Sequence, residues 1–122
     1  MVKRVLIVDD EANIVASLEF LMRQKGYDVR VAGNGVEALA AVADFNPDLM
    51  LLDVMMPQMS GYDVCQKVRA GPDGLRVKIV MVSAKGREVE VSKGLAVGAD
   101  AYVTKPFSTR DLVAQIQELL AE

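Results

Sequence analysis

The feature that most constrains the fold is a regular alternation of short aliphatic runs with longer amphipathic segments. Continuous apolar runs occupy residues 5–8, 49–52 and 79–82. Such runs are typical of strands that are covered on both faces, as in a parallel sheet. Residues 28–32 alternate instead, which suits an edge strand, and residues 101–103 form a brief fifth strand.

Segments with helical periodicity follow each of these strands. They are expected at residues 11–25, 35–45, 61–70, 87–97 and 108–120. Gly26 is expected to end the first helix in the left-handed conformation. The fourth helix has the weakest pattern because it contains Gly94, and residues 89–91 could also pass for a strand. The fivefold alternation of strand and helix predicts one doubly wound α/β domain with right-handed crossovers.

Length and composition agree with a single domain over residues 1–122. The hydrophobic content of 52% and charged content of 25% suffice for one core. The net charge of −3 predicts that this chain does not itself bind nucleic acid. No apolar stretch approaches the roughly 20 residues of a membrane span. A lone cysteine, Cys65, is expected in the core and is typical of a cytoplasmic protein.

The chain contains no histidine. This excludes Ser-His-Asp catalysis, histidine-bound metal ions and a phosphohistidine intermediate on this chain. Any chemistry must therefore use carboxylates, hydroxyls, lysines and the backbone.

Chemically active side chains follow four of the predicted strands. In chain order they are Asp9, Asp10, Asp53, Ser83 and Lys105. In an open parallel sheet the ligand site lies at the carboxyl ends of the strands, where the strand order reverses. The sequence therefore predicts that three carboxylates, a hydroxyl and an ammonium group converge on one edge of the sheet.

Such a group of side chains is suited to magnesium and phosphate. Neighbouring carboxylates stay ionised together only if a counter-charge is present, and Mg²⁺ prefers a few carboxylates together with water and phosphate oxygens. Lys105 adds charge for a further anion, Ser83 can donate a hydrogen bond, and a carboxylate can act as the nucleophile. We therefore expect a Mg²⁺ site at which an aspartyl phosphate forms.

Four motifs resemble the signature sequences of two-component response-regulator receiver domains. They are VDDE at 8–11, LLDVMMPQMSG at 51–61, VSAK at 82–85 and YVTKPF at 102–107. The resemblance covers the whole chain and implies a flavodoxin-like, CheY-like fold with strand order 2-1-3-4-5. It also implies a phosphorylation-activated signalling switch that is not an enzyme with substrate turnover of its own.

The resemblance assigns roles to the acidic residues and the lysine. Asp53 corresponds to the phosphoacceptor, and Lys105 corresponds to the lysine that pairs with the phosphoryl oxygens. Asp10 corresponds to a direct Mg²⁺ ligand, and Asp9 to one that acts more through water. The carbonyl oxygen of Met55, together with Asp53, would complete the metal site.

The resemblance also identifies a switch. Ser83 corresponds to the switch hydroxyl and Tyr102 to the switch aromatic residue. Pro57 and Gly61 would shape the loop after the phosphoacceptor, and Pro106 would follow a cis peptide bond. The fourth helix, fifth strand and fifth helix would form the output surface, through which such domains can also dimerise. The sequence leaves open the roles of Met56, Met59 and Lys85.

The resemblance implies a partner that donates the phosphoryl group. Receiver domains take it from a phosphohistidine on a sensor histidine kinase or a histidine phosphotransfer protein. The absence of histidine here agrees with a donor on another chain. The sequence identifies neither the particular donor nor the output partner.

Three other functions compete with the switch. The segment VAGNGVEA at 31–38 contains the G-x-G-x-x-A spacing of a dinucleotide-binding loop, but it follows the expected edge strand and leaves Lys105 unexplained. A phosphatase with an aspartate nucleophile usually needs a second carboxylate two residues later, where this chain has Met55. A degenerate receiver that acts only by binding would not need the complete acidic set.

Overall fold

Strands and helices alternate along the chain in the computed structural model, which describes residues 2–72, 74, 76–84 and 86–121. The elements are β1 (Arg4–Val8), α1 (Ala12–Gln24), β2 (Asp28–Ala32), α2 (Gly35–Phe45), β3 (Leu49–Asp53), α3 (Gly61–Ala70), β4 (Lys78–Ser83), α4 (Glu88–Ala96), β5 (Ala101–Thr104) and α5 (Thr109–Leu120). The predicted elements are therefore all present, and the strand alternative for residues 89–91 is wrong because they lie within α4.

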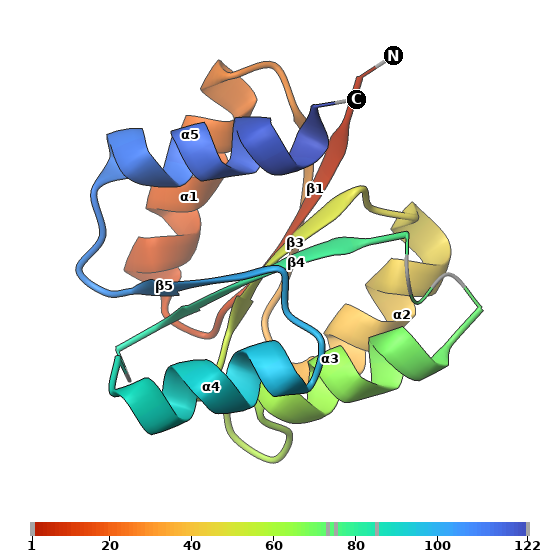
Figure 1. The fold of residues 1–122 in the computed structure, drawn as a ribbon. Coiled ribbons are helices and arrows are strands. Elements are labelled where there is room, and N and C mark those ends of the chain that lie inside the picture. Colours follow the sequence, from red (N-terminus) through yellow and green to blue (C-terminus); the bar gives the residue numbers. More distant parts are fainter. Residues whose placement is uncertain (1, 73, 75, 85, 122) are drawn as a thin grey trace.

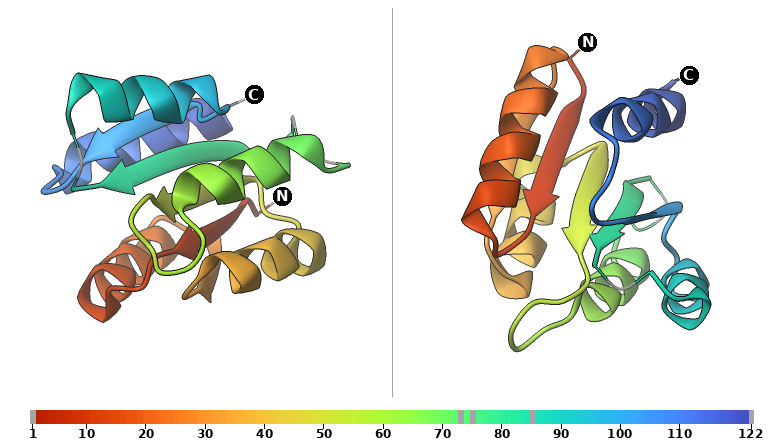
Figure 2. Two further views of the ribbon diagram at one scale, coloured as in Figure 1. Left: turned by 90° about the horizontal axis from the view of Figure 1, so that it is seen from below. Right: turned by 90° about the vertical axis from the view of Figure 1, so that its left-hand side faces the viewer.

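The strands form one parallel sheet in the order β2-β1-β3-β4-β5. Figure 1 shows α1 and α5 on one face of this sheet and α2, α3 and α4 on the other. In the right-hand view of Figure 2 the arrowheads of β1, β3 and β4 point to the same end of the sheet. The order reverses between β1 and β3, since β2 lies on one side of β1 and β3 on the other. The predicted fold class, strand order and edge position of β2 are confirmed.

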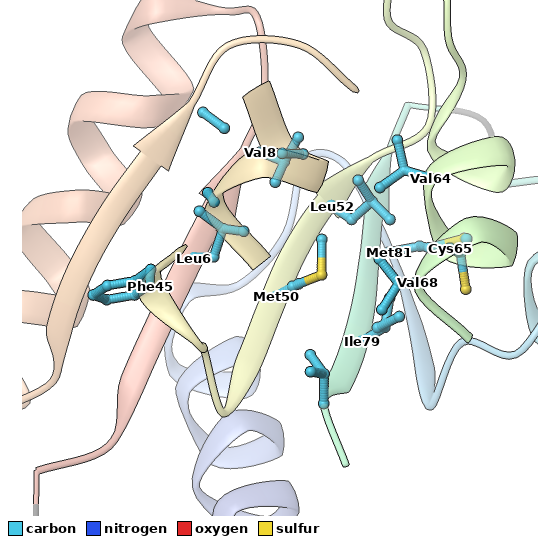
Figure 3. Packing of buried hydrophobic residues seen from close by; sticks show 14 of the residues in the cluster. Leu6, Val8, Phe45, Met50, Leu52, Val64, Cys65, Val68, Ile79 and Met81 are labelled. Carbon is cyan, nitrogen blue, oxygen red and sulfur yellow. The ribbon is translucent and has the colours of Figure 1, made fainter. Parts of the chain in front are cut away.

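Alternate residues of each central strand enter two separate hydrophobic clusters. Leu6 and Val8 of β1 point into a cluster that is completed by α2 and α3, and Val5 and Ile7 point into a second cluster beneath α1 and α5. Figure 3 shows the first cluster, in which Cys65 of α3 packs beside strand side chains. This burial on both faces explains the continuous apolar runs, because all residues of the runs 5–8, 49–52 and 79–82 are buried.

Local capping explains several helix boundaries. The Ser60 hydroxyl accepts a hydrogen bond from the backbone of Asp63, whose carboxylate accepts one from the Ser60 backbone, so α3 begins with a capping box. Asn34 caps α2 in a similar way. Gly26 follows α1 with a φ of 90°, the left-handed conformation that glycine adopts without strain.

In the described part of the chain, none of the helices combines the length and the apolar character that a membrane crossing requires.

Arg69 of α3 connects segments at the amino-terminal end of the sheet. Its guanidinium group donates hydrogen bonds to the carbonyl oxygens of Gly98 at 2.9 Å and Val77 at 2.6 Å, and to that of Gly74. It also forms an ion pair of 2.8 Å with Asp100, and the Arg69 side chain is only 16% exposed. One planar, largely buried donor group therefore fixes the loops that precede β4 and β5.

We expect Arg69→Lys to lower the free energy of unfolding by about 2 kcal/mol, because a lysine ammonium group cannot reach four acceptors that lie in different directions. Urea denaturation measures the effect. Arg30→Lys is the matched control, since Arg30 pairs with Asp44 at the surface and should change stability by no more than about 0.5 kcal/mol. Equal stability of the two variants would contradict the structural role of Arg69.

Candidate functional site

Three carboxylates meet at the carboxyl end of the sheet, beside the reversal of strand order. Asp9 and Asp10 directly follow β1, and Asp53 is the last residue of β3. One oxygen atom from each of the three lies within 4.8 Å of the other two. They converge because neighbouring parallel strands end at the same edge.

Asp9 is held in place by the start of α1 and by Lys105. Its Oδ1 atom accepts a hydrogen bond of 2.9 Å from the backbone N–H of Glu11. Its Oδ2 atom accepts one of 3.1 Å from the Lys105 ammonium group. Since Asp9 is buried and both its oxygens accept hydrogen bonds, the orientation of its carboxylate is fixed.

Lys105 lies among three acidic side chains. Its Nζ atom is 3.1 Å from Asp9, 3.3 Å from Glu11 and 3.7 Å from Asp53. Burial by itself lowers the pKa of Lys105, but the hydrogen bond with Asp9 and the charge of Asp53 outweigh it, so the pKa is raised and the ammonium form persists. The role of Glu11 was not predicted, although it is the third acid of the VDDE motif.

Asp53 is buried, with 3% of the residue exposed. Burial and then the charge of Asp9 raise its pKa from 3.8 to about 6, against the opposing effects of Lys105 and of the Met55 N–H, which lies 3.4 Å from Oδ1. Asp10 adds a further small increase. The ionised carboxylate of Asp53 therefore lacks full compensation from the protein, and an additional cation would stabilise it.

The loop after Asp53 depends on Gly61. A Cβ atom at this position would lie 2.3 Å from the Asp53 carbonyl oxygen, and the Gly61 N–H donates a hydrogen bond of 2.9 Å to the Val54 carbonyl. Glycine is required because the start of α3 passes directly against the end of β3. Pro57 lies on the exposed part of this loop, and the Met55 side chain is 57% exposed.

The roles left open for three residues are partly resolved. Met56 and Met59 pack against the cluster beneath α2 and α3, and the Met59 side chain covers Gly35. Lys85 lies outside the described residues.

The proposed switch residues lie on the neighbouring strands. Ser83 is fully buried at the end of β4, and its carbonyl oxygen accepts a hydrogen bond of 2.7 Å from the Lys105 backbone. The peptide bond between Lys105 and Pro106 is cis. Tyr102 of β5 is half-buried and packs against α4 at Gly94.

The sequence matches the model of a known protein family. The family model described as the response regulator receiver domain matches residues 5–117. The chain therefore belongs to the response regulator receiver domains, which act in two-component systems. The acidic cluster that could bind a metal ion lies on the residues that the resemblance had indicated.

Relatives of known name and structure support this membership. The DNA-binding response regulator MtrA of Mycobacterium tuberculosis is 45% identical over 120 residues, which cover 98% of this chain and 51% of MtrA. The sensory transduction protein RegX3 of Mycolicibacterium smegmatis is 45% identical over 116 residues, which cover 95% of this chain and 50% of RegX3. This chain thus spans about half the length of the curated relatives that it matches.

Solved structures share the whole fold. The chemotaxis protein CheY4 of Vibrio cholerae has a TM-score of 0.92 at 31% identity, with 98% of this chain and 100% of that chain covered. The BeF3-activated DrrB receiver domain has a TM-score of 0.89 at 28% identity, with 98% of each chain covered.

The relatives correct one expectation about partners. The net charge of −3 predicted that this chain does not itself bind nucleic acid, but MtrA is named a DNA-binding response regulator. That exclusion was wrong because net charge describes only the segment for which it is counted. The net charge of this chain carries no information about DNA binding by the remaining half of a protein such as MtrA, which is about twice as long.

The dinucleotide-binding alternative is also wrong. The glycine-containing segment follows the edge strand β2, away from the reversal of strand order. The Gly33 N–H donates a hydrogen bond of 3.0 Å to the Glu37 carboxylate. A negative side chain therefore occupies the position at the start of α2 where a pyrophosphate would need to bind.

We expect Asp53→Asn to stabilise the protein near neutral pH in the presence of a chelator. Because burial gives Asp53 a pKa of about 6 in the folded state against 3.8, protonation of Asp53 stabilises the folded protein. This stabilisation is complete below pH 3.8 and is lost as the pH rises through about 6. Asparagine avoids the buried charge and should add about 1–3 kcal/mol to the free energy of unfolding.

Urea denaturation across the pH range measures this difference, which should vanish below pH 3.8. Asp44→Asn is the control because Asp44 is 79% exposed. If the two variants were equally stable near neutral pH, the ionised Asp53 carboxylate would not be destabilising.

Proposed function

We propose that this domain is a signalling switch in which Asp53 accepts a phosphoryl group from a phosphohistidine on a kinase or phosphotransfer protein. The observation that carries the proposal is the convergence of Asp53 with Asp9, Asp10 and Lys105 at the reversal of strand order. Family membership supports the same function. It also favours a cytoplasmic setting, in which such a donor is available.

The chemical step is a transfer between two nucleophiles. A carboxylate oxygen of Asp53 forms a bond to phosphorus, the bond between phosphorus and the donor imidazole nitrogen breaks, and that nitrogen keeps the electron pair. Lys105 is protonated and lies 3.7 Å from Asp53, so its charge can stabilise the phosphoryl oxygens. No general base is required because Asp53 reacts as the carboxylate.

The residues present suit Mg²⁺. Asp9, Asp10 and Asp53 would hold the ion with the carbonyl oxygen of Met55, since oxygen atoms of carboxylates and carbonyls are the ligands that Mg²⁺ prefers. The raised pKa of Asp53 supports this assignment, because burial and a neighbouring carboxylate leave negative charge uncompensated. When bound, Mg²⁺ would neutralise charge on the phosphoryl oxygens.

Phosphorylation would change the surface around α4 and β5. A phosphoryl group brings about two negative charges and strong acceptor oxygens to Asp53. The Ser83 hydroxyl can donate a hydrogen bond to these oxygens, and Tyr102 can move toward the space that Ser83 leaves. We propose no independent turnover of substrate, since Met55 occupies the position at which aspartate phosphatases carry their second carboxylate.

We propose that the output acts on a DNA-binding segment. This rests on the 45% identity to MtrA, which is named a DNA-binding response regulator and is about twice as long.

Incubation with acetyl phosphate and Mg²⁺ should add one phosphoryl group to the protein, as measured by intact mass. The addition should be absent without metal and absent in Asp53→Ala, because the attacking carboxylate is then missing. Asp44→Ala should still be phosphorylated, since Asp44 lies at the surface on α2. Phosphorylation of Asp53→Ala to the same extent would refute the assignment of the acceptor.

A chimera tests the output. Replacing the matched part of MtrA with this chain should give a protein whose affinity for the DNA bound by MtrA rises after treatment with acetyl phosphate and Mg²⁺. In the same chimera with Asp53→Ala, the treatment should leave the affinity for DNA unchanged. A chimera that is phosphorylated without any change in DNA affinity would contradict control of DNA binding by this domain.

A further inference from the structure

A second tyrosine contacts both the switch residue Tyr102 and α4. Tyr62 is at the start of α3 and is half-buried. Its hydroxyl donates a hydrogen bond of 3.2 Å to the Glu90 carbonyl oxygen on α4. The ammonium group of Lys93, also on α4, lies 4.5 Å from the centroid of the Tyr62 ring. Two different contacts therefore hold the Tyr62 side chain against α4.

The Tyr62 hydroxyl also forms a hydrogen bond with the Tyr102 side chain. Each hydroxyl has one proton to donate. The Tyr62 proton is used on the Glu90 carbonyl, which can only accept, so the proton shared between the tyrosines comes from Tyr102. Burial raises the pKa of Tyr62 to about 12, which keeps its hydroxyl protonated and able to serve both partners.

The ring of Tyr102 is also confined by α4. A Cβ atom at Gly94 would lie 2.9 Å from the Tyr102 ring and 2.9 Å from the Met81 sulfur. The ring therefore packs directly on the helix backbone, in the one place in α4 where a side chain is absent. Its position is defined by close packing at Gly94 and by the hydroxyl acceptor that Tyr62 provides.

We propose that Tyr62 is a positioning residue that holds Tyr102 in its present orientation and so opposes activation of the switch. This rests on the proposed function, in which Tyr102 moves toward Ser83 after phosphorylation. Before it moves, Tyr102 must give up its hydrogen bond to Tyr62. Because Tyr62 is itself bound to Glu90 and Lys93, the same contact transmits the position of α4 to the switch residue.

The test removes one oxygen atom. In Tyr62→Phe the ring remains but the acceptor for Tyr102 is lost, so the active conformation should become more populated. The affinity for beryllofluoride in the presence of Mg²⁺ should rise roughly two- to tenfold, the factor expected for one hydrogen bond. Tyr27→Phe is the matched control, because Tyr27 is partly buried against the opposite cluster and should leave the affinity unchanged.

A double-mutant cycle separates positioning from a general effect on structure. Tyr102→Phe removes the donor of the same hydrogen bond and should raise the affinity to a similar extent. Tyr62→Phe should then have little further effect in the Tyr102→Phe background. Additive effects, or an affinity in Tyr62→Phe that is unchanged or weaker, would overturn the proposal.

NMR spectra of tyrosine-labelled protein without any ligand test Tyr62 independently of phosphorylation. The Tyr102 ring signals should shift in Tyr62→Phe and stay in place in Tyr27→Phe. Unshifted Tyr102 signals in Tyr62→Phe would overturn the role of Tyr62. A wild-type protein that failed to bind beryllofluoride at Asp53 would instead overturn the proposed function, and the spectra would still decide the role of Tyr62.

Discussion

The repulsion among Asp9, Asp10 and Asp53 is the constraint on which the rest of the site depends. Asp9 and Asp53 are both 3% exposed, and the three carboxylates come within 4.8 Å of one another. Lys105 offsets part of this charge by pairing with Asp9 and Asp53. The compensation is incomplete, as the raised pKa of Asp53 shows, so the site favours a cation and is destabilising without one.

The fold remains stable despite the repulsion among the carboxylates because its stability comes from other parts of the structure. The strands that carry the carboxylates are buried on both faces by two hydrophobic clusters, and Arg69 secures the opposite end of the sheet. The acidic residues lie where the strands end, so their repulsion does not interrupt any strand pairing. A sheet that is packed on both faces thus fixes the charges at one edge.

The sequence predicted the fold and the acidic site because both depend on local patterns. The apolar runs gave the strands, and the parallel order placed Asp9, Asp53 and Lys105 at one edge. The contacts of Tyr62 with Glu90 and of Arg69 with Gly98 could not be predicted in this way, because the partners lie 28 or more positions apart in the sequence. The expectation about nucleic acid failed for a different reason, since the charge of one segment does not describe the output of longer relatives.

The free energies involved indicate that phosphorylation alone would shift the equilibrium between the inactive and active conformations only in part. Moving a two-state equilibrium from mostly inactive to mostly active requires about 5.5 kcal/mol. A hydrogen bond from Ser83 to a phosphoryl oxygen would contribute about 1.5–3 kcal/mol. Moving Tyr102 away from Tyr62 and Gly94 opposes the change, since existing contacts are lost. The remaining free energy must therefore come from an output segment or partner that binds the active surface of α4 and β5 more tightly than the inactive one.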